Sequence, residues 1–272
     1  MSIYFIGTTV ATIREIDKLM KESKLQLLKI EDNLRHLIIV GNAGEVFGYL
    51  DSLVKHFNEE VLTWINELIA EPEILSMLIR RIIHDRNLLT RVLKESYYHE
   101  NGFHKIVLAA GEHFKLRLHH FGSSTKMPME NIHDHRWPFA SNILLGSLKM
   151  DIFQPHESEG EKLIHYRYNS QKSNGAYGIA PLGYKKLTLV RSVEYKAGEQ
   201  YLMPTTHLHR IINKPGEESI TLVLTGKPTS SVCNLYARRS ITQVEQQPLK
   251  YEEKVLEKML QSIVEKIYPT LN

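Results

Sequence analysis

The stretches 133–146, HDHRWPFASNILLG, and 198–213, GEQYLMPTTHLHRIIN, decide how the middle of this chain folds. The first holds His133 and His135, two positions apart, and the second holds two histidines with the same spacing. In a β-strand alternate side chains point to the same face, so each pair of imidazoles shares one face. Two antiparallel strands of one barrel bring such pairs together. We therefore expect a metal site built from both stretches.

The region around these stretches has the sequence pattern of a β protein. Of the 14 histidines, only His36, His56 and His84 lie outside residues 99–209. From about residue 101 to 240, short alternating apolar runs are separated by turn residues such as Gly146 and Gly198. This spacing is typical of an all-β sandwich or barrel.

Helical periodicity flanks the β region on both sides. From about Ile13 to Glu95 apolar residues recur at helical spacing, and Pro72 stands where a new helix would begin. Near the other end an amphipathic pattern runs from Val255 and stops at Pro269. We expect three parts, which are a helical region over 1–100 packed on the barrel, the barrel with its metal site over 101–240, and a C-terminal amphipathic helix over 241–272.

Composition bounds the class of protein and its partners. The chain has 272 residues, of which 42% are hydrophobic and 24% charged, as in folded globular proteins. Its formal charge of +3 includes no basic run, so no nucleic acid partner is expected. No apolar run reaches the roughly 20 residues of a membrane span, and no secretory signal opens the sequence. With Cys233 as its single cysteine, the chain is expected in the cytoplasm, away from membranes.

Both stretches resemble the two conserved motifs of the cupin superfamily. In the first motif an HxH pair is followed by Glu and then Gly, and this chain has His133, His135 and Gly146 at matching positions. The second motif is matched by Gly198, Pro204, His209 and Asn213, with Thr206 in place of an inner Gly.

The resemblance implies both a fold class and a ligand set. The fold would be mainly β, a cupin double-stranded β-helix (jelly-roll barrel) with an α-helical N-terminal region and a C-terminal helix. The metal ligands would be His133, His135 and His209, with His207 as a neighbour on the same strand face.

The chain departs from the cupin pattern at one ligand. The motif's Glu falls on Phe139, or on Ala140 with the longer spacing, and neither side chain binds metal. A cupin site with three His and no Glu is similar to the cysteine dioxygenase type of thiol dioxygenase, over about residues 60 to 225. In that type an Arg holds the amino acid carboxylate. Its position falls here on His104 or Lys105, so cysteine itself is not the expected substrate.

Three neutral ligands on Fe(II) leave room for a bidentate substrate and O₂, and the full charge of the ion favours an anionic chelator. We expect a mononuclear non-haem iron oxygenase, thiol-dioxygenase-like, that oxidises a small anionic or thiol-bearing molecule with O₂. Arg117, Tyr201 and His207 are the candidates for contact with substrate or O₂. Arg117 would clamp a carboxylate if its strand face points inward.

Several alternatives stay open at this point. Zn or Ni would suit three His and a water on ligand type, giving a cupin isomerase, hydrolase or lyase. A 2-oxoglutarate oxygenase needs a carboxylate ligand, which requires Asp134 or Glu130 to turn inward. A non-catalytic ligand-binding cupin is a third possibility, and the size of the helical extension also leaves a homodimer open.

Overall fold

The computed structural model describes residues 28–56, 59–99, 101–123, 130–169, 178–241 and 249–269. The part of the expected helical region before residue 28 lies outside these ranges. Residues 28–40 are helical. The later helices are α2 (Ala43–His56), α3 (Glu60–Ile69), α4 (Pro72–His84), α5 (Arg86–Glu95) and α6 (Glu253–Ile267).

Local signals in the sequence account for two of these helix starts. Pro72 occupies the first turn of α4, where its missing N–H costs no hydrogen bond. Asp85 caps α5, because its carboxylate accepts hydrogen bonds from the backbone N–H groups of Asn87 and Leu88. The predicted helical character of this region is confirmed over the residues that the structure describes.

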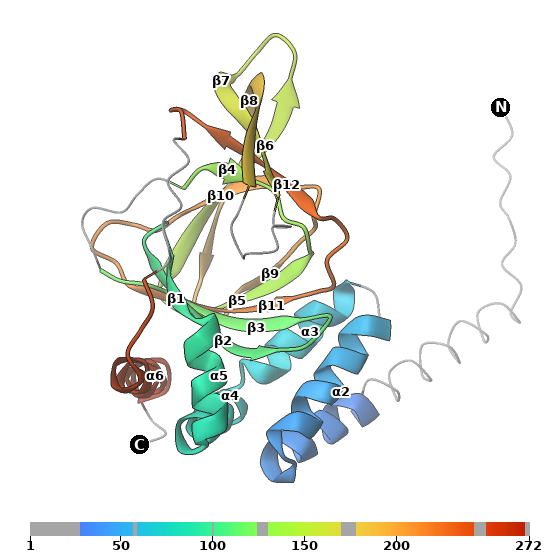
Figure 1. Ribbon diagram of the computed structural model, residues 1–272, viewed down its shortest axis with the longest axis vertical. Coiled ribbons are helices and arrows are strands. Elements are labelled where there is room, and N and C mark those ends of the chain that lie inside the picture. The colour runs from blue at the N-terminus through green and yellow to red at the C-terminus, as the bar shows by residue number, and fades with distance from the viewer. Residues whose placement is uncertain are drawn as a thin grey trace, which may run out of the picture.

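Two antiparallel sheets follow the helices (Figure 1). Strands of the first sheet lie in the order β1 (Tyr97–His99), β2 (Phe103–Ala110), β3 (Lys115–Phe121), β11 (Ser219–Thr225), β5 (Phe139–Leu145) and β9 (Gln200–Met203). Strands of the second lie in the order β10 (Leu208–Ile212), β4 (Ile132–His133), β12 (Val232–Ala237), β7 (Glu161–Asn169), β8 (Gly178–Lys196) and β6 (Ser147–His156). The second sheet closes on itself, because β10 also pairs with β6.

The two faces of the first sheet have different partners. Its outer face packs on the helices through one hydrophobic cluster that includes Ile65, Leu116 and Leu260. Its inner face carries an aromatic cluster that includes Phe103 and Phe139 and lines the barrel interior. Alternation along the strands produces this division, since neighbouring residues point to opposite faces. In Figure 1 the helices accordingly lie below the sheet and the second sheet above it.

Gly146, the glycine of the first motif, makes the tight turn between β5 and β6. Its φ is +72°, a left-handed conformation that side chains disfavour. A Cβ atom there would also lie 2.1 Å from the carbonyl oxygen of Glu218. Only glycine fits this turn, which gives a physical reason for the motif.

The predicted fold class is confirmed, because the described chain is mainly β with two antiparallel sheets and helices before and after them. The predicted division into three parts at residues 100 and 240 stays a prediction. One hydrophobic cluster contains residues of the helices on both sides and of the first sheet, so the packing marks no boundary at either position. None of the described helices is long and apolar enough to cross a membrane.

Candidate metal centre

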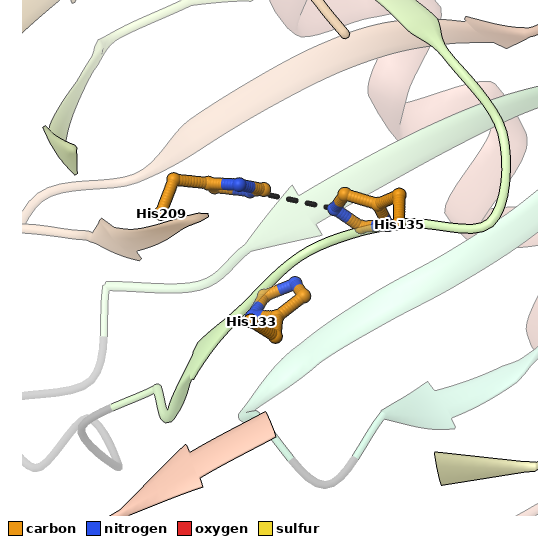
Figure 2. A group of neighbouring side chains, drawn as sticks. All are labelled: His133, His135 and His209. Carbon is orange, nitrogen blue, oxygen red and sulfur yellow. Dashed lines mark hydrogen bonds between the residues drawn. The ribbon is translucent and has the colours of Figure 1, made fainter. Parts of the chain in front are cut away.

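The structure brings the three predicted ligands together (Figure 2). His133 on β4 and His209 on β10 stand directly opposite each other in the strand register, with ring centroids 4.8 Å apart. His135 lies just beyond β4, and its ring centroid is 4.8 Å from that of His133 and 5.0 Å from that of His209. One nitrogen from each ring lies within 4.8 Å of the other two. A single metal ion can be held by such a group.

The protonation of the rings suits metal binding. His133 Nδ1 lies 2.9 Å from the carbonyl oxygen of Asn131 and donates a hydrogen bond to it, so Nε2 is the ring nitrogen that would bind a metal. The Nε2 atoms of His135 and His209 are 3.4 Å apart. Burial, followed by the charge of His133, holds the pKa of both His135 and His209 well below the ordinary value. Both imidazoles are therefore neutral at pH 7, the form that binds metal.

His135 is not on a strand, which differs from the prediction. The spacing of the histidines predicted one strand that carries both, but β4 ends at His133. His135 instead belongs to the segment 134–138, which we call the ligand loop. The two rings still lie close together, with centroids 4.8 Å apart, and Figure 2 shows both on one segment of the chain near His209.

No carboxylate joins this group among the described residues. The motif's Glu position holds Phe139, whose ring centroid is 4.9 Å from that of His135. Asp134 accepts hydrogen bonds from Asn234, through the backbone N–H and the side-chain amide. Glu130 accepts from the side chain of Asn101 and from the backbone N–H of Ile211. Both carboxylates that could supply the single carboxylate ligand of a 2-oxoglutarate oxygenase are thus engaged elsewhere.

Two of the other predicted site residues lie inside the barrel. Arg117 on β3 is 7% exposed, and its guanidinium carbon lies 5.2 Å from the ring centroid of Trp137. Tyr201 on β9 is 9% exposed, and its ring centroid is 6.1 Å from that of Phe139. Burial raises the pKa of Tyr201 above its ordinary value, so its hydroxyl stays protonated.

His207 does not share a strand face with His209, and that expectation is wrong. It is exposed and precedes the start of β10 at Leu208. Pro204 removes a backbone donor just before this turn, and the ladder with β6 begins only at Leu208. His207 nevertheless stays near His209, because its backbone raises and its charge lowers the pKa of His209, both by less than burial and the charge of His133 lower it.

Lys105 falls on one of the two positions that match the carboxylate-holding Arg, but the sequence did not identify it as a site residue, and the structure places it beside Arg117 in the interior. Lys105 on β2 pairs in register with His119 on β3, and its ammonium donates to the Tyr97 hydroxyl at 2.9 Å. Burial is the main cause of its lowered pKa, and the charge of Arg117 is the next. The available signal was a lysine directly after His104 near the start of the mostly apolar strand FHKIVLAA.

Comparison with known proteins gives only distant matches. Neither a protein-family model nor a curated protein matches this sequence. An RmlC-like cupin from Shewanella frigidimarina is 11% identical, with 50% of this chain and 86% of that chain covered and a TM-score of 0.30. The polyketide cyclase RemF from Streptomyces resistomycificus is 13% identical, with 55% and 82% covered and a TM-score of 0.33.

A third solved structure is hydroquinone 1,2-dioxygenase from Sphingomonas sp. with 4-hydroxybenzoate bound. It is 8% identical, with 55% of this chain and 77% of that chain covered and a TM-score of 0.31.

Proposed function

We propose that this chain is a mononuclear non-haem iron oxygenase of the cupin type, thiol-dioxygenase-like, that oxidises a small anionic or thiol-bearing molecule with O₂. The observation that supports it is the convergence of three imidazoles, from His133, His135 and His209, with no carboxylate among their described neighbours. Bound Fe(II) would supply open positions at which a chelating substrate and O₂ lie side by side.

The charges around the centre favour an anionic substrate. Three neutral ligands leave the charge of a divalent ion uncompensated. Burial disfavours the charged form of Lys105, but Arg117 beside it adds positive charge to the same interior, and this charge lowers the pKa of His135 after the effects of burial and the neighbouring histidines. An anionic group bound between them would offset this charge, with the planar guanidinium of Arg117 able to hold a carboxylate by two hydrogen bonds.

Tyr201 and His207 complete the proposed substrate contacts. Tyr201 offers a protonated hydroxyl inside the barrel, which can donate a hydrogen bond to substrate or O₂. His207 lies at the exposed turn before β10, where it can contact a group of the substrate that reaches out of the barrel.

Oxygen consumption by the iron-loaded protein tests the proposal. The probes are 3-mercaptopropionate, a thiol with a carboxylate, and cysteamine, a thiol with an ammonium group, followed by a panel of small carboxylic acids. We expect O₂ uptake that is lost in His209→Ala, and faster uptake with the carboxylate-bearing thiol. Arg117→Met should erase this preference while the iron content stays the same.

The same measurement separates the alternatives. Iron-loaded protein that consumes no O₂ with any of these probes would contradict the oxygenase. Three His and no carboxylate is also a ligand set for Zn and a bound water, so that result would favour a Zn- or Ni-dependent isomerase, hydrolase or lyase. Protein that takes up no metal would favour a ligand-binding cupin.

A further inference from the structure

The ligand loop is tied to one neighbouring segment at every second residue. Backbone hydrogen bonds join Asp134 N–H to the Asn234 carbonyl at 3.2 Å, Thr229 N–H to the Arg136 carbonyl at 2.7 Å, and Gly226 N–H to the Pro138 carbonyl at 2.8 Å. All the partners lie between the end of β11 and the middle of β12. The position of His135 therefore depends on this segment.

The contact between Asp134 and Asn234 also uses side chains. β4 pairs with β12 through His133 and Leu235, so Asp134 and Asn234 form the next pair of the ladder. Here, however, the Asn234 N–H binds the Asp134 carboxylate at 2.6 Å, and the Asn234 side-chain amide donates to the other carboxylate oxygen at 2.6 Å. A carboxylate replaces the backbone acceptor, which lets the ligand loop leave the ladder between the two metal ligands.

A further histidine fixes the orientation of the Asn234 amide. His165 Nε2 lies 2.8 Å from Asn234 Oδ1, and the His165 ring is stacked on Tyr236 with ring centroids 4.5 Å apart. The amide nitrogen already faces Asp134, so the amide oxygen faces His165 and accepts from it. Both polar atoms of the Asn234 side chain therefore have a hydrogen-bond partner.

We propose that Asn234, oriented by His165, is a positioning residue of the metal centre. It holds Asp134, and through Asp134 it sets the directions in which His133 and His135 point. This inference rests on the proposed metal centre. Groups that orient metal ligands without binding the metal typically change metal affinity by about 10- to 100-fold.

Exchanging the two side chains tests whether their hydrogen-bond complementarity matters. Asn234→Asp places two carboxylates against each other, and Asp134→Asn leaves one acceptor oxygen for two donors. The double variant restores the match, since the new amide at 134 donates to the new carboxylate at 234, which also accepts from His165. Rescue by the double variant is not expected if each residue only fills space.

The readouts are the visible absorption spectrum of Co(II)-loaded protein, which reports coordination geometry, and the rate of Co(II) loss to EDTA. We expect each single variant to change the spectrum and to lose Co(II) about tenfold faster or more, and the double variant to recover toward wild type. Asn66→Ala is the matched control. It removes a buried amide that donates to the Leu222 carbonyl at 3.1 Å, far from the ligand loop in the chain, and it should leave the Co(II) spectrum unchanged.

Single variants with the wild-type spectrum and loss rate would overturn the inference, and so would a double variant no better than either single. If wild-type protein binds Co(II) and the variants do not differ from it, only the positioning role fails. If wild-type protein takes up no Co(II), the proposed metal centre fails with it. Circular dichroism monitors folding, and Asp134→Asn, which adds no charge, carries the test if Asn234→Asp does not fold.

Discussion

Phe139 decides the charge of the candidate site, because it stands where the cupin motif has Glu and lies against His135. Phe139→Glu should lower the stability of the metal-free protein by about 3 kcal/mol or more, since it removes a buried ring and buries a carboxylate. Added Mn(II) should then raise the Tm of the variant more than that of wild type, because Mn(II) is a hard ion that binds well to a fourth, anionic carboxylate ligand. Phe139→Gln is the control, because glutamine has the shape of glutamate without its charge. An equal rise in Tm with metal in both variants would contradict a role for the anionic ligand.

Single residues were predictable from the sequence where it resembles the two cupin motifs. His133 and His209 met as expected because cross-strand register places them opposite each other. His207 was placed wrongly, because alternation holds only within a strand and β10 starts after it. Lys105 was missed as a site residue, because the sequence does not show which face of β2 lines the barrel.

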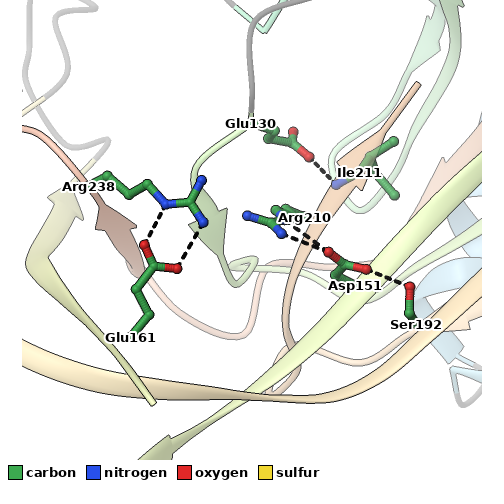
Figure 3. Close-up of polar contacts among 7 residues, drawn as sticks. All are labelled: Glu130, Asp151, Glu161, Ser192, Arg210, Ile211 and Arg238. Carbon is green, nitrogen blue, oxygen red and sulfur yellow. Dashed lines mark hydrogen bonds and ion pairs between the residues drawn. The ribbon is translucent and has the colours of Figure 1, made fainter. Parts of the chain in front are cut away.

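At the scale of elements, one ion pair joins β10 to its neighbouring strand β6 in the barrel. Arg210 lies opposite Asp151 of β6 in the register and donates to its carboxylate at 2.8 Å, and Ser192 of β8 donates to the other oxygen at 2.6 Å (Figure 3). Asp151 is 3% exposed. Arg210 thus points away from the metal group on the opposite face of the strand that carries His209.

Asp151→Ala should destabilise the protein by about 3 kcal/mol at pH 7, because it leaves the charge of Arg210 largely buried without its partner. Urea unfolding measures the difference. Glu161→Ala is the control, since it breaks a more exposed pair with Arg238 and should cost less than about 1 kcal/mol (Figure 3). Equal losses in the two variants would contradict the assigned role.

The effect of Asp151→Ala should also depend on pH. Burial alone would raise the pKa of Asp151, but the hydrogen bonds from Ser192 and Arg210 outweigh burial and hold the pKa below its ordinary value. The stabilisation that the ionised Asp151 gives the folded protein is therefore complete above the unfolded pKa of about 3.9. It is lost as the pH falls through the lower pKa of the folded state. Urea unfolding at pH 3 should show a smaller gap between wild type and variant than at pH 7.

The type of most helices and strands could be predicted from the sequence, but the residues at which they begin and end could not. Pro72 and the amphipathic pattern from Val255 located helices correctly because these signals are local. β4 ends at His133, and the next residue, Asp134, accepts through its carboxylate from the backbone N–H of Asn234, which lies about a hundred residues away in the chain. No local pattern contains that information.

At the scale of the whole molecule, the helices and the first sheet share one core. Leu260 of α6 and Ile65 of α3 belong to the same cluster as Leu222 of β11. Tyr268, just after α6, donates to the Ala70 carbonyl at 2.7 Å and so joins the end of the chain to α3. The sequence indicated that helices flank a barrel, but only the packing shows that they cover one face of it.

We therefore expect the helical layer and the barrel to unfold together. The two tryptophans report on the two parts, since Trp64 lies in α3 and Trp137 lies beside Arg117. Trp137→Phe leaves only the helical reporter, and Trp64→Phe leaves only the barrel reporter. Fluorescence and circular dichroism should give coincident urea midpoints within each variant. Separate transitions for the two signals would show two units instead.

The central claim is that three histidines hold one metal ion, and elemental analysis tests it most directly. Wild-type protein and His209→Ala are purified anaerobically without chelators and compared for metal per chain. The account predicts about one iron per wild-type chain and its loss in a variant that stays folded. Stoichiometric zinc or nickel would contradict the oxygenase, and a variant that keeps its iron, or a wild-type protein without metal, would contradict the site itself.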